Sequence, residues 1–251
     1  MPIRYNEVKP WGRSYDEYVR MFALTPVDLQ RSILGCGDGP ASFNAEMHAA
    51  GHAVISIDPI YQFSAAELRQ RISETYEDVI GQARRNASLF RWDEIGSIEE
   101  LGRRRMSAME RFLEDYETGR EQQRYVYSEL PSLPFGDRQF DLALCSHLLF
   151  LYTDNLSLDF HLASIRELCR VAREVRVFPL IDANGNRSAY LGPVIDFVRE
   201  QGMDAAEVNV DYEFQKGGNT MLMIKAYDKR KIASRCGIIR SRGNRPDSHH
   251  R

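Results

Sequence analysis

Short apolar runs along the chain are separated by stretches with the spacing of amphipathic helices. The runs predict β-strands, and they lie at residues 32–36, 53–57, 125–127, 140–145 and 174–178. Helices are predicted between them, at residues 15–23, 41–48, 157–170 and 194–201. Strands that alternate with helices in this way are typical of an α/β fold with a mostly parallel sheet.

The last part of the chain departs from this alternation. Residues 207–214 and 220–227 both read as strands, and Gln215-Lys216-Gly217-Gly218-Asn219 between them leaves no room for a crossover helix. The sequence therefore predicts a mostly parallel sheet with an antiparallel C-terminal hairpin strand at one edge.

A long charged stretch separates the second and third predicted strands. Residues 62–124 are helical in pattern, and S-x-x-E capping boxes begin at Ser64 and Ser97. A crossover between parallel strands needs only about a dozen residues, so this stretch is predicted to be a helical insertion. An apolar stripe in it predicts a buried helix face, formed by Ile98, Leu101, Met109, Phe112 and Tyr116. We expect the insertion to act as a cap and to supply substrate specificity.

Charge divides the chain into an acidic body and a basic tail. The 251 residues carry a net charge of −3, yet residues 229–251 hold eight Lys or Arg residues and one acid. An acidic body is a poor match for nucleic acid. The tail is predicted to be mostly disordered, with an arm for RNA or an acidic partner as the alternative. We therefore expect an N-terminal helical cover at 1–30, a main domain at 31–228 and this tail.

The sequence also bears on compartment and on metal binding. No apolar run approaches the roughly 18–20 residues that span a bilayer, and the first residues lack the layout of a signal peptide. Four cysteines are scattered without a CxxC pair or a histidine at metal-ligand spacing, namely Cys36, Cys145, Cys169 and Cys236. This pattern predicts reduced thiols in a cytoplasmic protein, with neither disulfides nor a zinc site.

A glycine-rich loop follows the first predicted strand. The loop Gly35-Cys36-Gly37-Asp38-Gly39 leads into a helix, and Asp58 closes the next strand. Glycines let the backbone approach a ligand, and a carboxylate can accept two hydrogen bonds from a sugar diol. The unit therefore predicts a nucleotide-type ligand, and by itself it suits NAD as well as other cofactors.

Residues further along resemble the class I S-adenosylmethionine-dependent methyltransferases, over roughly 30–227 apart from the insertion. The glycine loop resembles the first motif of that family. Glu129, followed by Leu133-Pro134-Phe135 and then Phe140-Asp141-Leu142, resembles its acid-x-x-x-LPF…FDL signature. The hairpin also fits, because the family fold ends in an antiparallel strand inserted in the sheet. The resemblance implies a Rossmann-like, doubly wound sheet and S-adenosylmethionine as the cofactor.

The resemblance also implies roles for single residues. Asp58 would bind the ribose hydroxyls, and Glu129, or Leu130 through its backbone, would meet the adenine. The implied cofactor contacts are Gly35, Cys36, Gly37, Asp38, Gly39, Asp58, Pro59, Glu129, Leu130 and Ser146. One position departs from the family, since Ile33 stands where an acid usually helps to hold the amino group of the cofactor. Asp38 is the expected substitute.

The methyl acceptor is predicted to be a small molecule. The segment Cys145-Ser146-His147-Leu148 lacks the Asn/Asp-Pro-Pro-aromatic motif of enzymes that methylate nucleic-acid amino groups, and Cys145 lacks the setting of a catalytic cysteine. His147 should emerge at the carboxyl edge of the sheet, where an imidazole could act as a general base. The alternative is a histidine that is hydrogen-bonded to the neighbouring loop. Further candidates to line the acceptor pocket are Tyr15, Tyr61 and Tyr152.

Three functions remain open on the sequence. The first is a methyltransferase with a small-molecule acceptor and no contact with a membrane. The second is an NAD-dependent oxidoreductase, although Pro40 stands where the dinucleotide fingerprint has a third glycine. The third is a protein that binds S-adenosylmethionine without transfer activity, or one whose tail recruits RNA or a protein acceptor.

Overall fold

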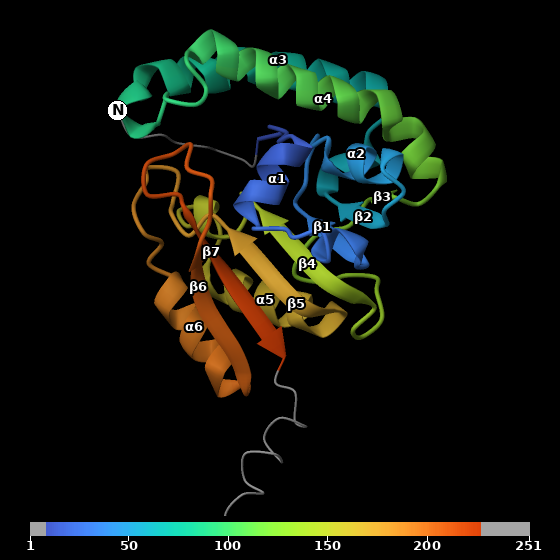
Figure 1. The fold of residues 1–251 in the computed structure, drawn as a ribbon, viewed down its shortest axis with the longest axis vertical. Helices are drawn as coiled ribbons and strands as arrows, with labels where there is room; N and C mark the ends of the chain where they lie inside the picture. The colour runs from blue at the N-terminus through green and yellow to red at the C-terminus, as the bar shows by residue number, and fades with distance from the viewer. Residues whose placement is uncertain (1–8, 227–251) are drawn as a thin grey trace, which may run out of the picture.

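One seven-stranded sheet forms the centre of the protein, whose computed structural model describes residues 9–226. Its strands are β1 (Ile33–Cys36), β2 (Val54–Ile57), β3 (Tyr125–Val126), β4 (Phe140–Ser146), β5 (Ala172–Phe178), β6 (Met203–Asn209) and β7 (Thr220–Ala226). They lie in the order β3-β2-β1-β4-β5-β7-β6, and β7 runs antiparallel to both of its neighbours (Figure 1). The predicted fold, mostly parallel with an antiparallel strand inserted near one edge, is confirmed.

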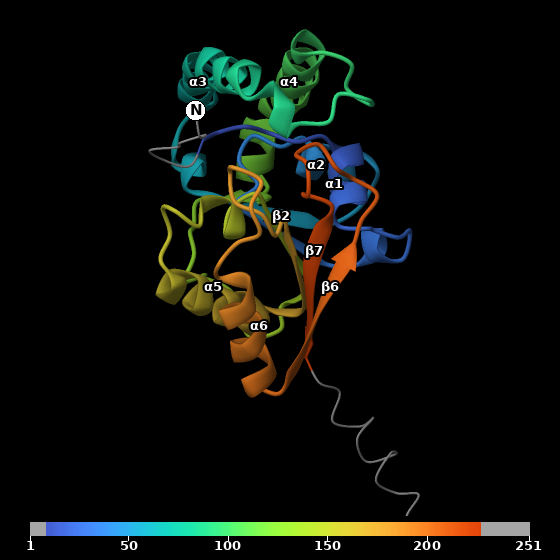
Figure 2. The same ribbon diagram turned by 90° about the vertical axis from the view of Figure 1, so that its left-hand side faces the viewer.

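Helices cover both faces of the sheet. They are α1 (Tyr15–Met21), α2 (Phe43–Ala49), α3 (Ala65–Arg85), α4 (Ile98–Glu121), α5 (Leu158–Val171) and α6 (Leu191–Glu200). In Figure 2, α5 and α6 lie on one side of the sheet and α1 on the other. Side chains along β4 alternate accordingly, because successive residues of a strand point to opposite faces. Ala143 and Cys145 pack with the α5–α6 side, whereas Leu142 and Leu144 pack with the α1–α2 side.

The sheet reverses its winding direction between β1 and β4. From β1 the chain proceeds outward to β2 and β3, and it then returns to place β4 on the other side of β1. Such a switch point opens a crevice at the carboxyl ends of the strands, where open α/β sheets bind ligands. The residues that follow β1, β2 and β4 therefore meet at one edge.

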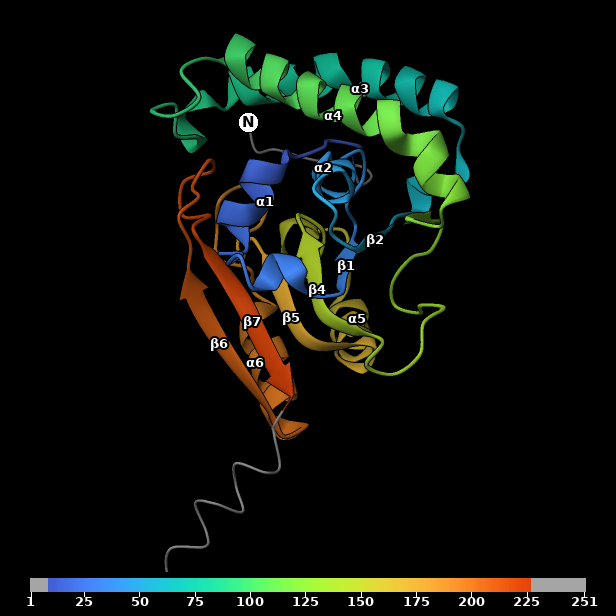
Figure 3. The ribbon, with the colours of Figure 1, turned by 45° about the vertical axis from the view of Figure 1, so that its right-hand side comes forward.

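The stretch predicted to be an insertion folds into a hairpin of two long helices. In Figures 1 and 3, α3 and α4 lie side by side across the end of the sheet at which the parallel strands finish. The capping box at Ser64 forms with Glu67, whereas Ser97 caps the Glu100 N–H without the reciprocal bond. In α4 the predicted stripe is buried, except that Ile98 is half-buried.

One arginine lies within the apolar stripe of α4, a feature that the sequence analysis missed. The side chain of Arg105 is 1% exposed and forms a hydrogen bond and ion pair with Glu17 of α1. The Tyr212 hydroxyl also donates to Glu17, at 2.8 Å. Burial opposes the ionisation of Glu17, but the Arg105 guanidinium, the Arg13 charge and the Ser14 N–H together lower the pKa of Glu17 to about 2. The α3–α4 hairpin is thereby tied to α1 and to the β6–β7 loop through Glu17.

The C-terminal hairpin differs from its prediction in detail. β6 begins at Met203, before the predicted start at residue 207 and directly after Gly202, which has a left-handed φ of +72°. Residues 210–214, predicted as strand, belong instead to the loop between β6 and β7. They leave the strand pairing because Phe214 stacks on Phe90, with ring centroids 4.8 Å apart, and its carbonyl accepts from Arg91 N. The predictions for the tail at 229–251 and for Cys236 lie outside the described residues.

The Arg105–Glu17 pair should contribute much more to stability than its exposed neighbour. We expect Arg105→Met to lower the free energy of unfolding by about 3 kcal/mol, because it leaves a buried carboxylate without its main counter-ion. Arg104, whose side chain is 52% exposed, pairs with Glu100 on the helix surface. Arg104→Met should cost less than about 1 kcal/mol. Urea unfolding of the two variants measures the difference, and equal losses would contradict the assignment.

Candidate active site

A cavity of about 300 Å³ lies at the carboxyl ends of β1, β2 and β4. All of the predicted site residues except Gly35 line it, namely Cys36, Gly37, Asp38, Gly39, Asp58, Pro59, Glu129, Leu130, Ser146 and His147. They come from stretches far apart in the sequence. The structure thus brings the predicted cofactor residues and the predicted base to one place, while the role of each residue stays a prediction.

The glycine loop is shaped around the side chain of Asp38. A Cβ at Gly35 would lie 1.8 Å from Asp38 Oδ2, so Gly35 makes room for this carboxylate rather than facing the cavity. Gly37 and Gly39 have φ angles of +68° and +54°, which favour glycine. The carbonyl of Gly39 accepts a hydrogen bond from Tyr61 Oη at 2.8 Å, which helps to fix the loop.

Both carboxylate oxygens of Asp38 are engaged within the protein. Oδ1 accepts from Tyr18 Oη at 2.8 Å, and Oδ2 accepts from Ser56 Oγ at 2.6 Å. Burial raises the pKa of Asp38 to about 7, against the effect of these two bonds, and the nearby Asp58 carboxylate adds to the rise. As the predicted substitute for the missing acid at Ile33, Asp38 would hold a ligand only through its remaining lone pairs.

Asp58 stands at the end of β2 and caps the short helix η2 (Pro59–Gln62). Its Oδ1 accepts from Ile60 N and its Oδ2 from Gly39 N, both at 2.9 Å. Burial raises the pKa of Asp58 to about 6, although these bonds oppose the rise. A carboxylate has about four acceptor positions, so Asp58 can fix the loop and still accept from a ligand.

His147 follows β4 directly and has a left-handed φ of +50°. Its N–H donates to the Phe178 carbonyl at 2.7 Å, and its Nδ1 lies 3.0 Å from Ser146 Oγ. Burial, and then the positive charges of Arg13 and Arg105, lower the pKa of His147 well below its usual range. The imidazole is therefore neutral at neutral pH, and it can accept a proton as a weak base.

A second cavity, of about 80 Å³, adjoins the first and shares Trp11, Arg13 and His147 with it. Its remaining walls come from the α3–α4 region, the segment after β4, the end of β5 with the loop that follows it, and the β6–β7 loop. They are Val79, Gln82, Ala83, Phe90, Leu101, Leu151, Phe178, Pro179, Ile181, Ala183, Tyr212, Phe214, Gln215 and Gly218. The stretch that the sequence suggested as a cap thus supplies one wall of this second cavity.

Some lining residues differ from the sequence predictions. None of the candidate tyrosines Tyr15, Tyr61 and Tyr152 lines either cavity. Tyr15 instead stacks on Phe43, and Tyr61 is buried against the glycine loop. The sequence analysis missed Trp11, which the segment before α1 places over both cavities. A tryptophan beside the predicted N-terminal cover was the available signal.

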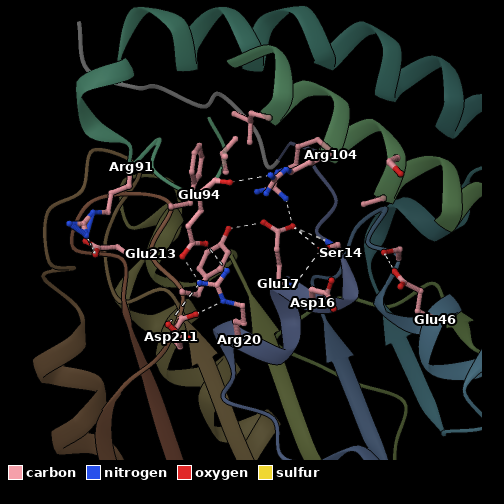
Figure 4. Close-up of a pocket in the computed structure, with 18 of the residues that line it drawn as sticks. Ser14, Asp16, Glu17, Arg20, Glu46, Arg91, Glu94, Arg104, Asp211 and Glu213 are labelled. Carbon is pink, nitrogen blue, oxygen red and sulfur yellow. Dashed lines mark hydrogen bonds and ion pairs between the residues drawn. The ribbon is translucent and has the colours of Figure 1, made fainter. Parts of the chain in front are cut away.

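An open, charged groove of about 940 Å³ lies between α1, α4 and the β6–β7 loop (Figure 4). Its charges largely satisfy one another. Arg20 forms two hydrogen bonds with Glu94, at 2.7 and 2.9 Å, and Arg91 pairs with Glu213 at 2.9 Å. The groove contains none of the predicted site residues, so we place the candidate site in the two smaller cavities.

The part of the chain that the structure describes, residues 9–226, has neither a candidate metal site nor a helix that could span a membrane. In that part of the chain no cluster of His, Cys, Asp or Glu could hold a metal ion. No helix there is long and apolar enough to cross a membrane. Cys36, Cys145 and Cys169 are free thiols, and Cys145 is fully buried in β4.

The pKa of Asp38 predicts a pH dependence of stability. Between its ordinary value of 3.8 and its native value of about 7, the native state binds more protons than the unfolded chain. The free energy of unfolding of the wild type should therefore decrease, relative to that of the Asp38→Asn variant, as the pH rises from about 5 to about 8. Thermal unfolding of both proteins at several pH values measures this difference. A difference that does not change with pH would contradict the raised pKa.

Comparison with known proteins identifies one close relative. No family model matches the chain. The uncharacterized protein MJ0045 of Methanocaldococcus jannaschii is 34% identical over 218 residues, which cover 85% of this chain and 94% of that protein.

Solved structures give more distant likenesses. A magnesium protoporphyrin IX methyltransferase from Synechocystis with bound S-adenosylmethionine is 12% identical at a TM-score of 0.47, over 85% of this chain and 78% of that one. A methyltransferase from Aquifex aeolicus is 13% identical at a TM-score of 0.40, over 84% and 88%. The chain belongs to the same family as the M. jannaschii protein, and its sheet has the topology of the class I S-adenosylmethionine-dependent methyltransferase fold.

Proposed function

We propose that the protein is an S-adenosylmethionine-dependent methyltransferase that acts on a small-molecule acceptor. The observation that carries this proposal is the convergence of three separate stretches on one cavity at the switch point. The glycine loop, Asp58 and the Glu129–Leu130 pair were each assigned to the cofactor by resemblance, and all three line that cavity.

The residues of the cavity fit the parts of this cofactor. Asp58 offers carboxylate oxygens to a ribose diol, and Glu129 with the buried Leu130 stands where the adenine would bind. The side chain of Leu148 packs against Gly37, and a Cβ at residue 37 would lie 2.9 Å from Leu148 Cδ2. Because Gly37 has no side chain, its backbone can lie directly against a ligand. When bound, the cofactor would supply a methyl group on a positively charged sulfur.

His147 is the residue best placed to move a proton. It lines both cavities, and so stands where the cofactor cavity meets the second one. A neutral imidazole can take the proton that an acceptor hydroxyl, amine or thiol loses as it gains the methyl group. The hydrogen bond to Ser146 and the contact with Phe178, with ring centroids 5.4 Å apart, fix the orientation of the ring.

A small acceptor is favoured by the size and enclosure of the second cavity. Its volume is about 80 Å³, and its walls come from the cap, the segment before α1 and two loops. A nucleic-acid strand would need an open basic channel, whereas this cavity is narrow and mostly apolar. NAD stays the alternative cofactor, and binding without transfer stays the alternative activity.

Substitution of Asp58 tests the cofactor. We expect Asp58→Ala to weaken S-adenosylmethionine binding at least about tenfold, because hydrogen bonds to a charged group contribute about 1.5–3 kcal/mol. Asp204→Ala, at an exposed position in β6, is the matched control and should bind as the wild type does. Calorimetric titration with S-adenosylmethionine and with NAD measures both. Binding of NAD without S-adenosylmethionine would refute the proposal.

Substitution of His147 tests the transfer step. The assay follows labelled methyl groups from S-adenosylmethionine into metabolites that pass a size filter. We expect His147→Ala to slow this transfer by about 10²–10⁴-fold with cofactor affinity unchanged, as for loss of a general base. His52→Ala, a histidine that lines neither cavity, is the control. Unchanged turnover in His147→Ala would exclude the base role.

A further inference from the structure

Two guanidinium groups have buried donors without partners: Arg13 lines both cavities, and Arg105 lines the charged groove. In the part of the chain that the structure describes, Arg13 Nε, Arg105 Nε and Arg105 Nη2 are shielded from solvent and make no hydrogen bond. Buried polar donors are nearly always satisfied, so each exception calls for an explanation. Arg13 Nη1 donates to the Trp11 carbonyl at 2.7 Å, which holds the side chain in place.

The charges around these groups do not balance. Arg13 and Arg105 both lie near the single carboxylate of Glu17, and Arg105 takes the direct hydrogen bond to it. Burial, followed by repulsion from Arg105, lowers the pKa of Arg13. Among residues 9–226, Arg13 therefore has no direct acidic partner, and a buried charge is costly until an anion pairs with it.

The lining of the second cavity matches an aromatic anion. Five aromatic side chains line it, Trp11, Phe90, Phe178, Tyr212 and Phe214. Among the described residues that line it, Arg13 is the one charged side chain. His147 also lines it but is neutral, and none of the lining residues is acidic. Aromatic walls favour a planar ligand by stacking and edge contacts. A cationic amine would meet Arg13 at close range and be repelled.

We propose that the second cavity is the acceptor subsite, and that it takes a planar aromatic molecule with a carboxylate group that pairs with Arg13. This inference rests on the proposed function. A cavity that admits benzene has a volume on the order of 150 Å³, so a ring would extend from this smaller cavity toward the cofactor cavity. Arg13 and His147 line both, and a ligand that crosses the boundary meets the cation and the base together.

The test is binding of matched ligands to the full chain saturated with S-adenosylhomocysteine. The probes are salicylate with salicylamide, indole-3-acetate with indole-3-acetamide, and tryptamine as a cation. We expect the acids to bind at least about tenfold more tightly than their amides, as for a charge-assisted pair. Tryptamine should show no binding. An absence of acid preference, including no binding by any probe, overturns the inference.

Variants identify the group responsible. Arg13→Gln should abolish the acid preference, and Arg13→Lys should retain part of it, because lysine keeps the charge but not the planar fork. Arg104→Gln, on the exposed face of α4, should leave the preference unchanged. A preference that persists in Arg13→Gln overturns the assignment to Arg13.

A second measurement separates this inference from the proposed function. If Arg13→Gln weakens S-adenosylhomocysteine but not 5′-methylthioadenosine, which lacks the amino-acid part, Arg13 pairs with the cofactor carboxylate. The acceptor assignment then fails while the methyltransferase proposal stands. If S-adenosylhomocysteine does not bind even the wild type, the proposed function fails. In that case the acids and their amides are compared without S-adenosylhomocysteine, and tighter binding of the acids shows whether Arg13 holds an anion.

Discussion

The buried carboxylate of Glu17 connects three parts of the chain that are far apart in sequence. Arg105 reaches it from α4, the Tyr212 hydroxyl reaches it from the β6–β7 loop, and Glu17 itself closes the capping box of α1. α4 and the β6–β7 loop also line the second cavity, and the segment just before α1 lines both cavities. A charge in such a position is stabilising only while every partner is present. The cap, the first helix and the last loop thus depend on one another.

Enclosure has a chemical consequence at His147. Burial is the largest cause of the lowered pKa of His147, and the same two arginines that lie near Glu17 lower it further, so both keep the imidazole neutral. In a site of low dielectric constant, such interactions are stronger than in water. Arg105 thus both holds α4 against α1 and, with Arg13, lowers the pKa of His147.

Much of the fold could be predicted because its signals are local. Apolar runs gave the parallel strands, and the short link at Gly217-Gly218 gave the antiparallel edge. Residues 210–214 were wrongly predicted as strand because Phe214 stacks on Phe90, a contact that no local sequence pattern reveals. Tertiary contacts decided the strand boundary there, not the propensity of the residues.

The candidate site was predictable where it is built on strand ends. Asp58 and the glycine loop occur at fixed points of a β-turn-α-β unit, so their position follows from the topology. The opposite wall depends on side chains brought together by folding, and Arg105 reads in sequence as one more charge on a solvated helix. Its burial depends on Glu17, 88 positions away.

The two cavities have almost separate sets of walls. Strand ends and the glycine loop form one, whereas the cap and two loops form most of the other, and Trp11, Arg13 and His147 are common to both. Substitutions at Val79 or Phe90 can therefore reshape the second cavity without touching the first. A change in the shape of the second cavity thus need not disturb the strand-end cavity. A substitution at any of the three shared side chains alters both cavities at once.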